Sequence, residues 1–402
     1  MATHCQVLVV GAGPAGGSLA GRLAAEGLDV VMVDRLADLR QAAFSSAALP
    51  RSAVERFGLP ACVQAAQWRG WQLVGPGDSQ RCWDAPESLG AVLDFGALRL
   101  WLAERATAAG VQLRLGLTAL SCREEPGGGM VTDLRGAGGE RTTIRSAWVV
   151  DASGEGRALL GEPPDHTLVS GVGVEWLLEV DEARWRSWSE RLSFFMGSRW
   201  VQQGYGWIFP MQPGQLKLGV CRLEQAGHHQ PPLAGELQSL LERTGLAAAP
   251  VLDRHGGRIR STIRRREPHR RGRLIGLGDA VSTANLLGGE GIRHALLAAE
   301  VLAPLLARAV RNGGDGHRWL GYHALGRYEA KLRRALGWRW SLSGRLARRT
   351  WLGLNGPRGD ARLETLLSGL AGCSAADLSA LLFEYRFERY GARALPYLLG
   401  WR

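Results

Sequence analysis

Paired cysteines are missing from this chain of 402 residues. The cysteines are scattered and form no Cys-x-x-Cys pair: Cys5, Cys62, Cys82, Cys122, Cys221 and Cys373. Structural metal sites need closely spaced ligands, and small secreted domains need a framework of disulfides, so neither class is indicated. We expect no metal and a protein that functions in the reducing cytoplasm.

Long hydrophobic runs are also lacking. No stretch approaches the roughly 18 uncharged apolar residues that a membrane-spanning helix requires. The N-terminus has no basic lead, and glycines interrupt its apolar run, which is typical of a strand rather than of a signal peptide. Any contact with a membrane is therefore expected to be peripheral.

Lysine is nearly absent, yet the chain is strongly basic. All but two of its 49 basic residues are arginine, the exceptions being Lys217 and Lys331, and the formal net charge is +11. Genome base composition explains arginine in place of lysine, but not the excess over acids. The excess predicts an anionic partner, such as a nucleotide, a diphosphate or an anionic membrane surface. Nucleic acid is not expected, because no recognition helix or base-stacking module is present.

A glycine-rich turn lies between two apolar strands at the start of the chain. Residues 7–10 are apolar, Gly11, Gly13 and Gly16 follow, and a second apolar strand ends at Asp34. The glycines permit a tight turn, a close approach to a pyrophosphate and tight helix packing, while amides at the helix start hold phosphates. The spacing predicts a dinucleotide site, with Asp34 on a ribose. The alternative is a βαβ unit without a ligand.

Two later strands end in the same way. Residues 147–150 lead into Asp151 and Gly154, and residues 274–278 lead into Asp279. A glycine-rich tract, residues 288–291, then precedes an expected helix over residues 292–310. We also expect a helix over residues 98–109 and hairpin turns at residues 127–129 and 138–139.

The remaining segments predict a second, sheet-based unit and a helical end. Residues 169–222 are strand-like, and residues 311–402 are helix-prone, basic and aromatic. Arginine and tryptophan are mixed in residues 333–340 and 345–351, which is typical of a helix lying on a membrane but also of helices that pack tryptophan inward. Arg264, Arg265 and Arg266 could grip a diphosphate or anionic lipid, or form a solvated hairpin.

The three strand-end motifs, in this order, resemble the two-dinucleotide-fold flavoproteins of the aromatic hydroxylase type. Two tracts, residues 204–210 (Gly-Tyr-Gly-Trp-Ile-Phe-Pro) and 289–292 (Gly-Glu-Gly-Ile), are similar to signatures of geranylgeranyl reductases. Residues 151–154 (Asp-Ala-Ser-Gly) match a form shared by these reductases and lycopene cyclases. The His and Pro that usually follow Gly-Asp-Ala in hydroxylases are absent after Asp279.

The resemblance implies an α/β flavoprotein of two domains with bound FAD. A Rossmann-like FAD-binding domain would comprise residues 1–75, 94–165 and 268–310. A substrate domain built on a mixed or antiparallel sheet would comprise residues 76–93 and 166–267, followed by the helical region 311–402. The implied FAD-binding residues are Gly11, Gly13, Pro14, Ala15, Gly16, Asp34, Arg35, Asp279, Gly288, Gly289, Gly291 and Ile292.

The same resemblance implies reduction of carbon–carbon double bonds in an isoprenoid or similar hydrophobic substrate, with or without a diphosphate. Hydride would pass from reduced flavin, which NADPH or a reduced redox protein would regenerate. Tyr205, Trp207 and Phe209 alternate along one strand and would form an aromatic wall, with a buried core face as the alternative. Glu290 would deliver a proton or complement the helix dipole. Glu175 would be a desolvated acid or a rim residue paired with arginine.

Other chemistries on this scaffold remain open: a lycopene-cyclase-like reaction, a monooxygenase, or a membrane-associated flavoprotein with a structural role. Two departures from the resembled family bear on the choice. Members often carry an Asp-Arg pair ahead of the helix at residues 98–109, whereas Asp94 is followed by Phe95 here. A tract rich in cysteine and glycine is replaced by Phe44-Ser45-Ser46-Ala47-Ala48.

Overall fold

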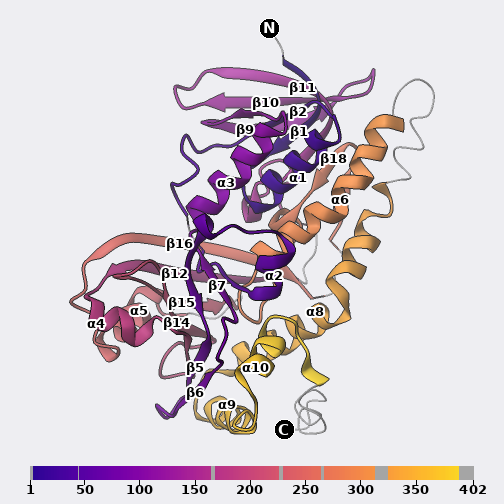
Figure 1. The fold of residues 1–402 in the computed structure, drawn as a ribbon. Helices are drawn as coiled ribbons and strands as arrows, with labels where there is room; N and C mark the ends of the chain where they lie inside the picture. Colours follow the sequence, from indigo (N-terminus) through magenta and orange to yellow (C-terminus); the bar gives the residue numbers. More distant parts are fainter. Residues whose placement is uncertain are drawn as a thin grey trace.

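A parallel sheet forms the core of the half of the molecule that contains the N-terminal motif (Figure 1). The computed structural model describes residues 3–43, 45–163, 168–225, 230–263, 267–312 and 325–388. Arg264, Arg265 and Arg266, and residues 313–324 and 389–402 of the expected helical region, lie outside these ranges. In this first sheet the parallel strands run in the order β18, β11, β1, β2, β8. Their bounds are Leu274–Gly276, Arg141–Asp151, Thr3–Val10, Val30–Val33 and Gln112–Arg114.

Different layers cover the two faces of the first sheet. Helices α1 (Pro14–Ala25), α3 (Phe95–Ala108) and α6 (Ile292–Asn312) pack on one face, where Val7, Val9 and Met32 are buried. The hairpin of β9 (Leu117–Glu124) and β10 (Met130–Gly136) covers the other face, where Leu8 and Val10 are buried. Burial on both faces explains why these strands are apolar throughout. The short β17 (Arg270–Arg271) pairs with β18 at the edge.

The local expectations hold, with one boundary moved. Turns join β9 to β10 and β10 to β11 at the expected glycines, and α6 begins at Ile292. Helix α3 begins three residues before the expected Leu98, at Phe95. The reason is the side chain of Asp94, which accepts a hydrogen bond from the Ala97 amide at 2.9 Å and so caps the first turn.

A second sheet, mostly antiparallel, forms the other half. Its strands run in the order β16 (Val251–Thr262), β12 (Leu168–Glu179), β15 (Gln215–Leu223), β14 (Gly204–Pro210), β13 (Arg191–Met196), β5 (Gly70–Val74) and β6 (Gln80–Asp84). Helices α4 (Glu182–Trp188) and α5 (Leu233–Arg243) cover one face. Helices α8 (Tyr328–Gly353), α9 (Pro357–Gly369) and α10 (Ala375–Leu382) belong to the hydrophobic cluster on the opposite face (Figure 1).

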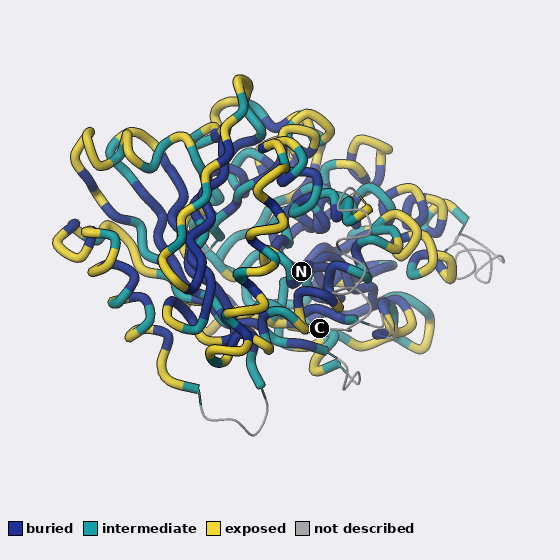
Figure 2. The backbone as a smooth tube through the Cα atoms, turned by 90° about the horizontal axis from the view of Figure 1, so that it is seen from below, coloured by how far each residue is buried: buried dark blue, intermediate teal, exposed yellow. Residues whose placement is uncertain are grey.

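A small third sheet consists of β3 (Ala48–Pro50), β7 (Gly90–Leu93) and β4 (Gln64–Trp68). Helix α2 (Arg51–Arg56) contacts β3 and β7 of this sheet. The tube in Figure 2 shows buried strands inside and exposed residues mainly along outer helices and turns. Because β5 and β6 both belong to the second sheet, a domain boundary at residue 75 would separate paired strands. We therefore propose that the substrate domain begins before Gly70, and that β7 goes with the small sheet.

Candidate functional site: a glycine-lined cavity beside an apolar cavity

The three strand-end motifs meet at one edge of the first sheet. Gly11 has a φ of +105°, and a Cβ there would lie 2.4 Å from the Ala152 carbonyl oxygen, so the first and second motifs touch. A Cβ on Gly278 would lie 2.8 Å from the Ala15 Cβ, so the third motif packs on the first turn of α1. The carboxyl ends of parallel strands are where doubly wound sheets bind ligands.

Gly13 and Gly16 have different surroundings. A Cβ on Gly16 would lie 1.9 Å from the Gly11 carbonyl oxygen, so this glycine allows α1 to pack against the turn. A Cβ on Gly13 would meet no protein atom within 4 Å, because this position faces a cavity. Pro14 follows at the first helical position, and the amides of the first turn of α1 have no partner within the helix. The turn therefore leaves space and hydrogen-bond donors for an anionic group.

Asp34 lies at the end of β2 and holds the turn in place. Its Oδ2 accepts the Ala12 amide at 2.7 Å, and its Oδ1 accepts the Leu36 amide at 2.9 Å. Asp34 is half-buried and Arg35 is exposed, and both line the glycine-lined cavity. Asp34 therefore holds the turn and lines the cavity, and its contact with a ribose stays a prediction.

The start of α6 lies at the same cavity. Gly288, Gly289, Gly291 and Ile292 line it, and a Cβ on Gly291 would lie 3.0 Å from Asp279 Oδ2. Burial raises the pKa of Asp279, although the Thr283 hydroxyl donates a hydrogen bond to it at 3.1 Å. Two helix N-termini, those of α1 and α6, therefore border one elongated site.

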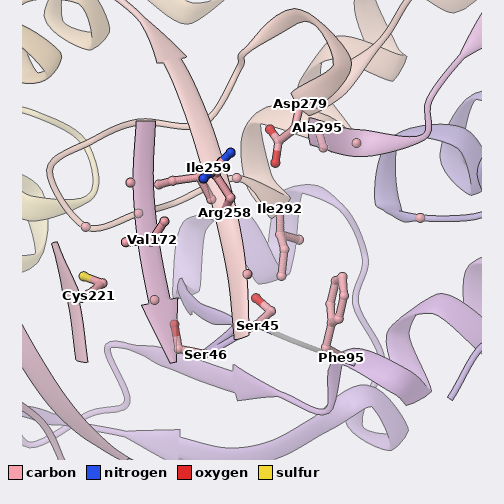
Figure 3. Close-up of a pocket in the computed structure, with 18 of the residues that line it drawn as sticks. Ser45, Ser46, Phe95, Val172, Cys221, Arg258, Ile259, Asp279, Ile292 and Ala295 are labelled. Carbon is pink, nitrogen blue, oxygen red and sulfur yellow. The ribbon is translucent and has the colours of Figure 1, made fainter. Parts of the chain in front are cut away.

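The glycine-lined cavity has a volume of about 370 Å³. Figure 3 shows Asp279 and Ile292 among its walls, with Val172, Arg258 and Ile259 from β12 and β16 of the second sheet. Every residue expected to bind FAD lines this cavity except Gly16, which packs against the turn behind it. The cavity therefore lies between the two sheets, and the first sheet's motifs form one side of it.

A larger apolar cavity of about 620 Å³ adjoins the first. Residues of the 45–46 tract, β14 and the tract 288–292 line both cavities, whereas Gly11, Gly13 and Asp34 line only the glycine-lined one. Most of the other side chains that line the apolar cavity are hydrophobic: Leu49, Trp71, Leu73, Met196, Leu346, Leu363, Leu367, Leu370, Leu381, Leu382 and Phe383. Thr350, Arg362 and Thr365 are polar or charged exceptions. The two cavities therefore meet at the α6 end of the site.

The alternating aromatic residues of β14 share one face, as expected, but differ in position. Tyr205 and Phe209 line both cavities, whereas Trp207 lines only the glycine-lined one. Tyr205 packs against Trp351 of α8 at 4.9 Å between ring centroids, and its hydroxyl lies 3.5 Å from the Cβ position of Gly289. Burial raises the pKa of Tyr205 well above its ordinary value, so the hydroxyl keeps its proton.

Glu175 is not a rim residue with an arginine partner. Its side chain is 1% exposed, accepts a hydrogen bond from the Trp207 indole at 3.1 Å and lies 3.8 Å from the Lys217 ammonium. Burial raises the pKa of Glu175, partly offset by Lys217. Lys217 also donates to the Ser45 carbonyl at 2.6 Å, so this buried pair connects the second sheet to the 45–46 tract.

Glu290 is buried in a network at the start of α6. Arg293 donates two hydrogen bonds to its carboxylate, at 2.6 and 2.8 Å, and the Tyr385 hydroxyl donates a third at 3.0 Å. Burial opposes ionisation, but Arg293 and Tyr385 outweigh it, and the pKa of Glu290 is lowered. An anion held in this way is poorly suited to donate a proton. Asp151 has a structural role, because its carboxylate accepts hydrogen bonds from the amides of Ser153, Leu159 and Leu160.

Sequence reasoning missed several residues of the site. Arg99 of α3 lines the glycine-lined cavity, and Ser45, Ser46 and Trp351 line both cavities. Arg99 carried a weak signal, because a charge interrupts the apolar residues of an expected buried helix. Trp351 carried none, since only tertiary packing brings α8 to β14.

These residues fit FAD. The open position at Gly13 leaves room for a diphosphate, Asp34 is placed for a ribose, and the α6 N-terminus lies where a ring that gains negative charge would be stabilised. Burial raises the pKa of Cys221, which also lines the cavity, to about 12, so its thiol is not a ready nucleophile. Together the fold and the site define a two-domain flavoprotein of the α/β class.

The sequence profile of the lycopene cyclase protein family matches residues 6–330, and the chain belongs to this family. It is 26% identical over 328 residues to a digeranylgeranylglycerophospholipid reductase of Haloferax volcanii, covering 78% of each chain. It is 27% identical to a menaquinone reductase of Mycolicibacterium smegmatis, covering 76% of this chain and 77% of that protein.

The fold matches that of a geranylgeranyl bacteriochlorophyll reductase-like protein from Thermoplasma acidophilum. The TM-score is 0.80 at 19% identity, covering 97% of this chain and 98% of the other. Within the described ranges, no helix is long and apolar enough to cross a bilayer.

Proposed function

We propose that this protein is an FAD-dependent reductase that saturates carbon–carbon double bonds in the polyprenyl chain of a lipid-like substrate. The relatives reported above are named for a geranylgeranylated phospholipid and for menaquinone. These names share a polyprenyl chain rather than a headgroup, so the chain is the part of the substrate we assign to the apolar cavity.

One observation carries the proposal: the apolar cavity meets the glycine-lined cavity at the α6 end and not at the Asp34 end. Ribose and diphosphate binding at Gly13 and Asp34 would direct the flavin of FAD toward Gly288, Gly289 and Ile292. When bound and reduced, FAD supplies the hydride, and an acid or an ordered water supplies the proton that completes the saturated bond. A chain in the apolar cavity would then approach the reactive end of the cofactor and not its adenosine.

The protein's own residues would bind, orient and shield the substrate. Tyr205 and Phe209 form the wall common to both cavities, and the buried aromatic rings around them exclude water. The α6 N-terminus, with Gly289 and Gly291 before it, would stabilise negative charge on the reduced ring. Glu290 is assigned to holding this N-terminus through Arg293, because its lowered pKa disfavours proton delivery.

Peripheral contact with an anionic membrane is part of the proposal. Trp338 is 66% exposed on α8, and Arg345 and Arg348 are exposed farther along the same helix. Arg358 and Arg362 are exposed on α9, and Arg362 also lines the apolar cavity. A basic surface next to an apolar cavity suits a substrate taken from a lipid layer. A diphosphate headgroup near Arg362 and NADPH as electron donor are further parts of the same proposal.

Anaerobic reoxidation of the reduced holoenzyme tests the function. The FAD-loaded protein is reduced without oxygen and mixed in turn with geranylgeranyl diphosphate, a digeranylgeranyl phospholipid and menaquinone. We expect flavin reoxidation and a product with two more hydrogens in its polyprenyl chain per reduced double bond. Reduction of the menaquinone ring to the quinol, with an unchanged chain, does not count as this reaction. A phytanyl lipid, which has no double bonds, is the matched control and should leave the flavin reduced.

Other outcomes would refute the proposal in distinguishable ways. A product isomeric with its substrate, with no flavin reoxidation, would indicate cyclase chemistry. Reoxidation that requires oxygen and adds an oxygen atom would indicate a monooxygenase. Absence of any response to all three substrates, in a protein that binds FAD, would favour a structural role.

A further inference from the structure

Arg99 is a buried guanidinium on the wall of the glycine-lined cavity. It lies on α3, is 7% exposed and lines the cavity together with Phe95, one turn earlier. Burial lowers its pKa, while Asp34 and Asp38 act in the opposite direction. No carboxylate among the described residues lies within ion-pair distance of it, and its Nε, buried in the protein, has no hydrogen-bond partner there.

The few contacts of Arg99 orient it without neutralising it. Its Nη2 donates to the Gln41 carbonyl, and its guanidinium lies 5.1 Å from the centroid of the Phe95 ring. A carbonyl and a ring face direct a guanidinium but do not carry a compensating charge. A buried cation is costly unless an anion pairs with it, so this position favours an anionic ligand.

The packing of α1 on α3 places this guanidinium level with the glycine-rich turn. A Cβ on Gly17 would lie 3.0 Å from the Leu102 Cβ, and a Cβ on Gly21 would lie 3.4 Å from the Ala106 Cα. Residue numbers rise together along the two helices, since Gly17 lies by Leu102 and Gly21 lies by Ala106. Going one turn back from Gly17 and Leu102 therefore leads to Pro14 and Arg99. Pro14 follows Gly13 in the chain, and Arg99 lines the same cavity as Gly13, where the protein leaves its backbone open.

We propose that Arg99 binds the diphosphate of FAD, opposite the amides that begin α1. The planar fork of a guanidinium can donate two parallel hydrogen bonds to two phosphate oxygens. The amides of the glycine turn would bind the diphosphate from one side, and Arg99 would bind it from the other. In this chain Phe95 occupies the position after Asp94 where the resembled family often has arginine. Arg99 supplies a guanidinium from the next turn of the same helix, with the Phe95 ring beneath it. The inference rests on FAD as cofactor and not on the substrate.

Cofactor binding to the apoprotein tests this assignment. Apoprotein of the wild type, Arg99→Met and Arg99→Lys is titrated with FAD, ADP and riboflavin. We expect Arg99→Met to weaken FAD and ADP binding by roughly 10- to 100-fold, the range of a charge-assisted hydrogen bond, and to leave riboflavin binding unchanged. Arg99→Lys should lose less, because it keeps the charge but not the fork. Arg105→Met, on the exposed side of the same helix, is the matched control.

Thermal unfolding of the apoproteins separates ligand binding from a structural role. Removing a buried charge without an anionic partner should leave the Tm of the Arg99→Met apoprotein unchanged or raised. A lowered Tm with equal loss of all three ligands, or FAD binding equal to that of the wild type, would overturn the assignment. If the wild-type apoprotein fails to bind FAD, the proposed cofactor itself is wrong, and this result is distinct from the other two.

Discussion

Glu290→Gln tests the ion pair at the start of α6. The Glu290 side chain is 7% exposed and that of Arg293 is 21% exposed, and the two are joined by hydrogen bonds of 2.6 and 2.8 Å. Breaking a buried pair by removing one partner costs about 3–5 kcal/mol. Because Arg293 keeps some solvent contact and its bond to the Phe383 carbonyl, we expect a loss of about 3 kcal/mol, the lower end of that range.

The double variant and the pH dependence sharpen this prediction. Glu290→Gln with Arg293→Met removes both charges and should recover most of the stability lost by the single variant. The lowered pKa of Glu290 means that the unfolded chain binds its proton more readily than the folded one. The carboxylate therefore contributes fully above its ordinary pKa of about 4.3, and its contribution falls as the pH drops through the folded value.

Urea unfolding of the apoproteins measures both effects. The urea concentrations at the unfolding midpoints are compared between variants with equal m-values, first at neutral pH and then at lower pH. The gap between wild type and Glu290→Gln should narrow below about pH 4. The reasoning fails if the single variant is as stable as the wild type, if the double variant is no more stable than the single, or if acid widens the gap.

Three further predictions concern the cofactor turn, the apolar cavity and the surface. Gly13→Val should abolish FAD binding, measured by titration, while the apoprotein still folds. Gly16→Val should prevent folding, measured by circular dichroism, because its Cβ meets the Gly11 carbonyl. Thr365 is exposed and lines the apolar cavity, so Thr365→Trp should raise the KM for a polyprenyl substrate several-fold without changing FAD affinity. The control Thr365→Ser should leave this KM unchanged. The double variant Arg345→Glu/Arg348→Glu should weaken binding to sedimented anionic vesicles by roughly 30-fold or more, at about 1 kcal/mol for each arginine lost, while Tm stays constant.

Sequence patterns of short range determined much of the fold. Gly16 packs against the carbonyl of Gly11 five residues earlier, and Gly289, just before α6, has a positive φ; such local constraints can be recognised along the chain. The same holds for the alternation of Tyr205, Trp207 and Phe209, since successive side chains of a strand point to opposite faces. Even the error at the start of α3 was local, because Asp94 caps the helix earlier than the apolar pattern suggested.

Roles that depend on distant partners could not be decided in this way. Whether Glu290 is a proton donor or a held anion depends on Tyr385, which another segment supplies. Whether Glu175 is a desolvated acid or a rim residue paired with arginine depends on its burial and on Lys217, which the neighbouring strand β15 supplies.

The sequence by itself determined that this protein has a dinucleotide turn, three strand ends of one type and an aromatic strand. Only the tertiary structure decided that α8 and α9 close an apolar cavity against that strand, and that Arg99 lies level with the glycine turn. The physical reason is that burial and pairing depend on the packing of whole elements. A residue's own neighbours in the chain carry little information about that packing.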